Sequence, residues 1–286
     1  MNDYKLVMLS LLPAACVLFA LAGAPYKMGG ESEIHILEPK LAKSYTIPTV
    51  DLSGEIARHV MVDRQRDRYF GHPSTLLLED GKTMYCGYSK NHGGPPLYLK
   101  KSIDGGLSWS DYLPVPANAE TLGNCPFLFY IPDSRGMDRL LMMVGGDDGI
   151  ANGMWQAASY DGGNTWSEYT NNGRNSVVAS PTMIAVKNGR KHLIWHHAYP
   201  DDGRKAGQHT ALNVYQSEST DGGETWGNTH AICEIENASP CEPGVVVSPS
   251  GKEMACLMRE NSRRLNSVVI FSEDEGKTWS KPRELP

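Results

Sequence analysis

The sequence predicts an all-β protein, a propeller built from repeated four-stranded blades. An eight-residue element with the pattern S-x-D-x-G-x-[ST]-W occurs four times, beginning at Ser102, Ser159, Ser219 and Ser272. Successive copies begin 57, 60 and 53 residues apart, so the period is nearly constant. No long segment shows the 3.6-residue periodicity of an amphipathic helix. A repeat of this length, without helices and punctuated by turns, is typical of propellers.

The repeated eight-residue element has the chemistry of a tight hairpin turn. Its Asp can accept hydrogen bonds from backbone N–H groups inside the turn. Its Gly supplies a backbone conformation with positive φ that other residues adopt at a cost. Its Trp buries a large ring beneath the turn. We therefore interpret the element as a stability motif and do not expect its aspartates to be catalytic.

Each period also contains a second hairpin. A short apolar run precedes every repeated turn, at 97–99, 155–157, 213–215 and 268–271. Earlier in each period a proline opens another apolar strand, and a turn such as Asp80-Gly81 or Ser250-Gly251 reverses the chain. Turn dipeptides of this kind between apolar runs are hairpin signals. The four opening prolines are Pro73, Pro126, Pro181 and Pro243. Two hairpins in one period give four strands, which make one blade.

The chain is predicted to have three parts. Residues 1–24 combine Lys5 with an apolar stretch ending in Ala22-Gly23-Ala24, which indicates a signal peptide or an N-terminal anchor. Residues 25–67 are expected to be an irregular leader. Residues 68–286 hold about four blades, and we expect this propeller to be incomplete at the C-terminus. The signal peptide or anchor at residues 1–24 predicts a secreted or periplasmic protein, or one of the cell envelope, with membrane contact only through the possible anchor.

Charge and cysteine content limit the possible partners. The formal net charge is −6, which argues against a nucleic-acid partner. Five cysteines follow the apolar segment, and none forms a CxxC pair, which argues against a zinc site. A metal site from His192, His196, His197 and His209 is an alternative, but no carboxylate lies at a fitting spacing, and we expect no metal or cofactor. We interpret them as small core residues, although a Cys233–Cys241 disulfide is possible in an exported protein.

The repeated turn resembles the Asp box of the sialidase (neuraminidase) superfamily, whose propellers have six blades. A second segment is more specific to that family: Cys241-Glu242-Pro243, an apolar strand, a turn, and then Met258-Arg259-Glu260-Asn261. This resemblance implies that Glu242 is a catalytic base. It also implies that Arg259 is one of three arginines that bind the substrate carboxylate. The resemblance covers roughly residues 69–286.

Strand topology alone predicts where a site would form. The first two strands of a blade are antiparallel, so the start of the first and the end of the second lie on one rim. The repeated turn lies on the opposite rim. Strand starts place His72, Asn124, Ser180 and Glu242 on the functional rim. Strand ends add Asn91, His92, Asp147, Asp148, His196, His197, and residues 259–261 with Arg259 and Asn261.

These rim residues suggest roles in sugar chemistry. Arg259 can bind a carboxylate bidentately, and Glu242 would handle the proton. The family's acid-base aspartate is missing, since the matching stretch holds Asn91 and His92. His92 is therefore the predicted acid, with His72 as the other candidate, because imidazole titrates near neutrality. We expect His72, Asn91, Asn124, Asp148 and Asn261 to contact substrate beside Arg259.

Other interpretations of the same residues remain open. Glu242 and Arg259 can form a purely structural ion pair, and His196-His197 can be strand-end residues without a role. Asp147-Asp148, beside two glycines, can be a tight turn.

The rim residues and the family resemblance together predict two functions. The first is an exo-α-sialidase-like glycoside hydrolase acting on terminal sialic acid or a related acidic sugar of glycoconjugates. The alternative is a non-catalytic, glycan-binding propeller. Gly71 stands where the family has its first arginine, and this departure favours the alternative.

Overall fold

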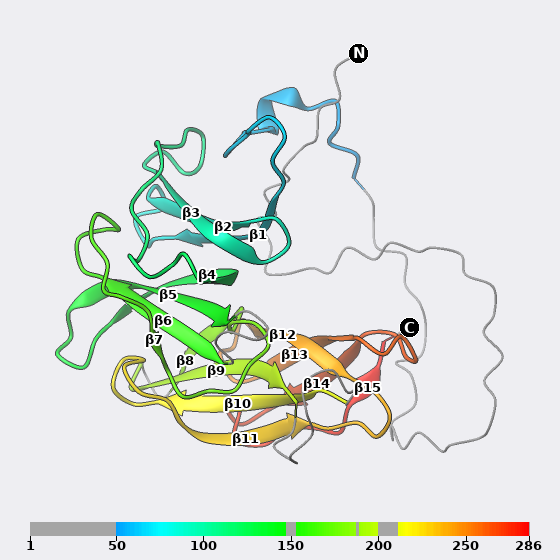
Figure 1. Ribbon diagram of the computed structural model, residues 1–286. Helices are drawn as coiled ribbons and strands as arrows, with labels where there is room; N and C mark the ends of the chain where they lie inside the picture. The colour runs from blue at the N-terminus through cyan, green and yellow to red at the C-terminus, as the bar shows by residue number, and fades with distance from the viewer. Residues whose placement is uncertain (1–49, 147–152, 187–188, 200–210, 286) are drawn as a thin grey trace. The chain divides into compact units, whose positions relative to one another are not determined.

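The computed structural model describes residues 50–146, 153–186, 189–199 and 211–285, which form four β-sheets (Figure 1). By internal contacts these residues fall into two units, 50–198 with 215–230, and 199 and 211–214 with 231–285. The expected signal peptide or anchor (1–24) and most of the leader lie outside the described residues. Between residues 50 and 67 the leader holds one 3-10 turn, Ile56–Arg58. No helix in the described ranges is long and apolar enough to cross a membrane.

The strands follow the order expected from the repeat. The first sheet contains β1 (Phe70–Leu77), β2 (Met84–Lys90) and β3 (Gly94–Ser102). The second contains β4 (Leu122–Pro132), β5 (Asp138–Gly146), β6 (Met154–Ser159) and β7 (Thr170–Asn171). The third contains β8 (Met183–Val186), β9 (Lys191–Ala198), β10 (Asn213–Ser219) and β11 (Gly227–Cys233). The fourth contains β12 (Pro240–Val247), β13 (Met254–Glu260), β14 (Val268–Ser272) and β15 (Arg283–Glu284).

The outer edge of the first sheet is less regular than in the others. The N–H groups of Ser110 and Leu113 donate to the carbonyls of Lys101 and Leu99, so a segment does run beside β3. Pro114 and Pro116 follow at once, and proline has no N–H to continue a ladder. In the described part of the chain this sheet therefore has three strands, where four were predicted.

The four repeated turns share one hydrogen-bond pattern. The Ser hydroxyl accepts the Gly N–H at 2.8–2.9 Å, and the Asp carboxylate accepts the N–H of the following Ser or Thr at 2.8–3.0 Å. The glycines have φ between 76° and 90°, as expected. Hydrogen bonds from Ser or Thr lower the pKa of Asp104, Asp161 and Asp274 to about 2. The carboxylates are thus satisfied inside their turns.

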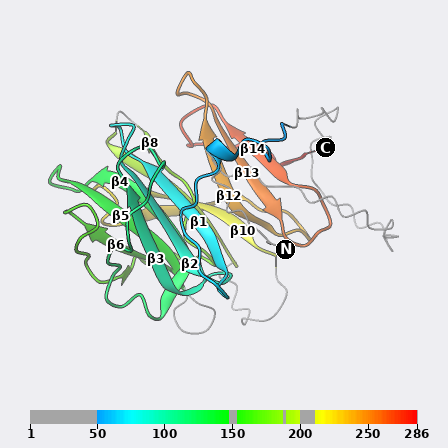
Figure 2. The same cartoon turned by 90° about the horizontal axis from the view of Figure 1, so that it is seen from above.

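The core of the first unit lies between its first and second sheets and between its second and third sheets, whose strands are labelled in Figure 2. Leu99 of β3 and Tyr85 of β2 pack in one cluster with Leu140 and Met142 of β5. The alternate β5 residues, Leu141 and Met143, pack in another cluster that includes Ile194 of β9. Side chains alternate between the faces of a strand, so β5 is buried on both sides.

The cysteines pack as small core residues. Cys86, Cys125, Cys233, Cys241 and Cys256 are buried thiols, with no disulfide among them in the described part of the chain. The possible Cys233–Cys241 disulfide is therefore wrong. Burial raises the pKa of the Cys233 thiol to about 12 and that of Cys241 to about 11.

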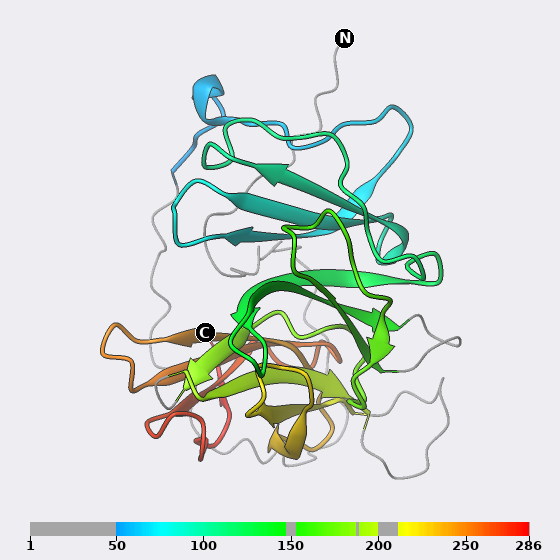
Figure 3. The ribbon, with the colours of Figure 1, turned by 90° about the vertical axis from the view of Figure 1, so that its left-hand side faces the viewer.

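Strand register places the strand ends of the first and fourth sheets as predicted. Phe70 pairs with Lys90, and Pro240 pairs with Glu260, so the start of the first strand meets the end of the second. At the other end of β13, Met254 pairs with Ser272, which opens the repeated turn. In Figure 3 the strands of each sheet run side by side between these two ends. We call the end with Pro240 and Glu260 the functional rim of the fourth sheet, and use the same term for the corresponding end of each other sheet taken by itself.

Candidate active site

A β-bulge at the functional rim aims one side chain in each of three sheets. His72, Cys125 and Glu242 have φ values of 50°, 51° and 51°, and each precedes a proline. The register of each strand shifts at this point. A bulge re-aims a side chain at a sheet end, and positive φ in a non-glycine residue before proline is costly. The backbone at these positions is therefore strained.

The second sheet differs from the prediction at this point. The strand start was expected to present Asn124, but the register of β4 shifts both before and after it. As a result Cys125 holds the place that His72 and Glu242 hold, and Asn124 lies one residue earlier. In the third sheet, Ser180 is fully buried, donates to the Thr182 carbonyl at 2.7 Å and accepts the Trp195 N–H at 3.1 Å. Ser180 thus has a structural environment.

Glu242 and Arg259 contact each other directly. Nη2 of Arg259 lies 2.8 Å from Oε1 of Glu242, and Arg259 pairs across the sheet with Cys241. The side chain of Arg259 is 50% exposed and that of Glu242 is 45% exposed. Exposed ion pairs contribute about 0–1 kcal/mol to stability, so an anionic ligand can compete for this guanidinium at little cost. The pair is both the ion pair considered as an alternative and an accessible carboxylate–guanidinium site.

Four predicted residues of the first two sheets gather around Gly93. A Cβ atom at Gly93 would lie 2.3 Å from Oδ1 of Asn124 and 3.6 Å from Cε1 of His72. The rings of His72 and His92 are 4.4 Å apart. Asn91 and His92 are exposed and belong to the turn between β2 and β3. The structure therefore brings His72, Asn91, His92 and Asn124 together, as strand topology predicted.

His72 is the half-buried member of this group. Burial lowers its pKa below the usual 6.5, and the nearby His92 lowers it further. Its Nδ1 atom is buried and accepts or donates no hydrogen bond among the described residues. The neutral imidazole is thus favoured near pH 7, where it can accept a proton or a hydrogen bond from a sugar hydroxyl.

The remaining predicted residues have varied surroundings. Asn261 is exposed just after β13, and its N–H donates to the Ser239 carbonyl at 2.9 Å. Asp147 and Asp148 lie outside the described residues. His196 and His197 are buried, and Nε2 of His196 lies 3.0 Å from the Ser217 hydroxyl. Among the residues that the structure describes, no group of three His, Cys, Asp or Glu side chains could hold a metal ion.

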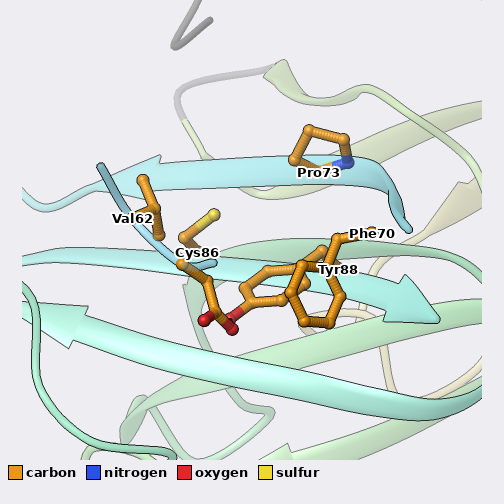
Figure 4. A pocket seen from close by; sticks show the side chains of 6 residues that line it. Val62, Phe70, Pro73, Cys86 and Tyr88 are labelled. Atoms are coloured by element: carbon orange, nitrogen blue, oxygen red, sulfur yellow. The ribbon is translucent and has the colours of Figure 1, made fainter. Parts of the chain in front are cut away.

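A small pocket lies elsewhere on the first sheet, on the face that carries Cys86 and Tyr88 (Figure 4). Its lining is mostly apolar, and the Asp63 carboxylate accepts hydrogen bonds from the hydroxyls of Tyr88 at 2.5 Å and Tyr112 at 2.7 Å. The lining residues are Val62, Asp63, Phe70, Pro73, Cys86 and Tyr88. None of the predicted site residues lines this pocket, although Pro73 directly follows His72 in β1.

Solved structures with the same fold include glycoside hydrolases. The chain is similar to a protein of unknown function from Dyadobacter fermentans, with 19% identity over 79% of this chain and 71% of that one, and a TM-score of 0.61. It is also similar to the GH93 α-L-arabinofuranosidase of Fusarium graminearum in complex with arabinobiose, with 16% identity, 75% and 66% coverage, and a TM-score of 0.59. A Hadza microbial sialidase gives 18% identity, 74% and 46% coverage, and a TM-score of 0.53.

These similarities establish the fold. The protein has a sialidase-like β-propeller fold, as the sequence predicted. The aligned region spans about two thirds of the arabinofuranosidase and less than half of the sialidase. No protein-family model matches the chain, and no curated protein matches it by sequence. One fold hosts many activities, so the activity of this chain has to follow from the site itself.

Proposed function

We propose that this protein is a glycoside hydrolase of the exo-α-sialidase type, which acts on terminal sialic acid or a related acidic sugar. The accessible Glu242–Arg259 pair carries this proposal. A guanidinium can bind the carboxylate of an acidic sugar through two parallel hydrogen bonds. A carboxylate beside it can accept the proton of an attacking hydroxyl group. The propeller glycosidases with similar folds support a sugar substrate but do not specify which sugar.

The proposal assigns a separate role to the histidines of the first sheet. Cleavage of a glycosidic bond needs a proton for the departing oxygen, and glycosidases usually supply it from a carboxylic acid. The matching stretch holds Asn91 and His92, and an amide cannot supply this proton. We assign proton donation to His92. His72, the other predicted candidate, suits this role less, because burial lowers its pKa and favours the neutral imidazole near pH 7. Hydrogen bonds to sugar hydroxyls are assigned to Asn91, Asn124 and Asn261. Asp148 keeps its predicted role in substrate binding. An exported or envelope location would suit a glycan substrate.

Replacing Glu242 by Gln tests the proposal most directly. The substitution keeps the size of the side chain and removes its capacity to take up a proton. Turnover of a fluorogenic sialoside should fall by at least about 10²-fold, the lower end of what acid-base catalysis supplies. Glu273→Gln is the matched control, because Glu273 is exposed beside the repeated turn at the other end of the same sheet. Full activity of Glu242→Gln, with both variants folded, would refute the assignment.

A glycan-binding protein without catalysis is the second candidate. It is favoured by the direct contact between Glu242 and Arg259, which uses the carboxylate to neutralise the arginine, and by Gly71 at the family's arginine position. A glycan array separates the two functions. Binding of acidic glycans by the wild type, without hydrolysis of any sialoside, would support the second candidate and exclude the first.

A further inference from the structure

A buried carboxylate lies directly beside the candidate pair. Glu260 is the last residue of β13, next to Arg259, and is only 6% exposed. Its Oε1 accepts the N–H groups of Ser239 at 2.7 Å and Ser262 at 2.8 Å. Its Oε2 accepts the N–H groups of Arg264 at 2.9 Å and Leu265 at 3.3 Å. Burial alone would raise the pKa of Glu260, but these hydrogen bonds outweigh burial and lower it.

These contacts tie together two segments that flank the pair. Ser239 precedes β12 and lies three residues before Glu242, whereas residues 261–265 form the loop that follows Arg259 and Glu260. The Asn261 N–H also donates to the Ser239 carbonyl, so the backbones of the two segments are joined on the same rim. One side chain therefore fixes the approach to Glu242 and the exit from Arg259.

The propeller fold does not require this carboxylate. By register with the strand that precedes it, Glu260 pairs with Pro240, as Lys90 pairs with Phe70 and Gly146 pairs with Leu122. The corresponding position thus holds a lysine in the first sheet and a glycine in the second. The buried acid occurs in the sheet that carries the Glu242–Arg259 pair, which suggests that it serves this site.

We propose that Glu260 is a positioning residue for the candidate site, which holds Glu242 and Arg259 in register by binding the backbone on both sides of them. This inference rests on the proposed function. Misplacement of a reacting group by about 1 Å can cost about 100-fold in rate. The carboxylate is therefore expected to matter for sugar turnover, although it need not touch the sugar.

The test compares Glu260→Gln with a matched change at the other end of the same sheet. Glutamine keeps one acceptor oxygen but turns an N–H₂ group toward backbone donors. Asp274→Asn makes the same chemical change in the repeated turn, where Asp274 also accepts backbone N–H groups, at 2.9 Å from Thr278 and 3.0 Å from Lys277. Amide hydrogen exchange of residues 239 and 261–265, the unfolding midpoint, and kcat and KM on a sialoside are measured for both variants.

For Glu260→Gln we expect faster exchange at residues 239 and 261–265, and a fall in kcat/KM of about 10- to 100-fold at temperatures where the variant is folded. Asp274→Asn should lower the unfolding midpoint and leave kcat/KM within about twofold. If Glu260→Gln does not fold, Glu260→Asp replaces it, because it keeps the charge and shortens the reach. Wild-type kcat/KM in the folded Glu260 variant, or an equal loss in Asp274→Asn, would overturn the proposal. A wild type that neither cleaves nor binds acidic glycans would instead refute the proposed function, while the exchange measurement still tests the positioning.

Discussion

His72 in the first sheet and Glu242 in the fourth hold the same position in their bulges. Each lies two residues after the residue that pairs with the end of the next strand, and each directly precedes a proline. Both His72 and Glu242 have φ near +50°. A non-glycine residue held in this region costs about 1–3 kcal/mol. The repeat therefore provides a strained position that presents a different side chain in each sheet, imidazole in one and carboxylate in another.

Replacing Arg259 should weaken the binding of acidic sugars selectively. Hydrogen bonds to charged groups contribute about 1.5–3 kcal/mol, so Arg259→Gln should raise KM for a sialoside by about 10- to 100-fold. A neutral aryl glycoside lacks the carboxylate, and any turnover of it should change little. Steady-state kinetics with both substrates measure the difference.

Lys277→Gln is the control for Arg259→Gln. Lys277 is exposed in the repeated turn of the fourth sheet, so its loss removes the same charge at the opposite end. Equal increases in KM for the two variants would show that overall charge, and not the guanidinium of Arg259, governs binding.

His92 should influence the titration of His72. Burial is the larger cause of the lowered His72 pKa, and the charge of His92 is the smaller one. His92→Asn removes the second cause only, so the pKa of His72 should rise toward 6.5 without reaching it. An NMR titration of the imidazole Cε1–H signals measures this shift, and His230→Asn should leave it unchanged. A His72 pKa that stays at the wild-type value would contradict the 4.4 Å ring contact.

The fold and the rim could be predicted from sequence because both follow from a repeat. Four copies of one turn fix the strand order, and antiparallel pairing then fixes which residues share an end. The contact between Glu242 and Arg259 was predicted as an alternative for the same reason. Cys125 was missed although the repeat marks it, since it directly precedes the opening Pro126 as His72 precedes Pro73 and Glu242 precedes Pro243; Asn124, one residue earlier, was chosen in its place.

Glu260 was placed on the functional rim with residues 259–261, but its burial and its backbone contacts were not predicted, for a different reason. The partners of the Glu260 carboxylate are backbone N–H groups, which every residue except proline has. No sequence pattern therefore predicts these hydrogen bonds. From sequence, an acid at a strand end looks like an exposed rim residue. Burial and the four donors around it become apparent only when residues 239 and 261–265 are seen in place.

Two glycines at one position of the repeated turn should differ in their tolerance of alanine. Gly105 and Gly222 have φ of 75° and 73°, so an alanine carries the same backbone strain at both. A Cβ at Gly222 would lie 2.3 Å from the Pro132 carbonyl oxygen, whereas at Gly105 the nearest atom is 3.6 Å away. Gly222→Ala should therefore destabilise the protein by about 1–3 kcal/mol more than Gly105→Ala. Urea unfolding of the two variants measures the difference, and equal losses would mean that the 132–133 backbone moves aside freely.

The buried His196 should make the protein less stable as the pH falls from 7 to 5. Burial lowers its pKa to about 4, whereas an unfolded chain has the ordinary value of 6.5. Between these two pKa values the unfolded state binds more protons than the folded state. The free energy of unfolding therefore decreases as the pH decreases, by about 3 kcal/mol between the unfolded and the folded pKa of His196. His72 and His192, whose pKa values are also lowered by burial, add to the slope.

His196→Gln should reduce this slope by up to one proton, as measured by urea unfolding at pH 7, 6 and 5. The repeated-turn aspartates do not interfere, because their lowered pKa values stabilise the protein throughout this range and that contribution is lost only below about pH 4. His197→Gln is the matched comparison, since it removes a buried imidazole from the opposite face of the same strand. A wild-type slope in His196→Gln would mean that this imidazole takes up its proton in the folded state as readily as in the unfolded chain, despite its burial against Ser217 and Tyr215.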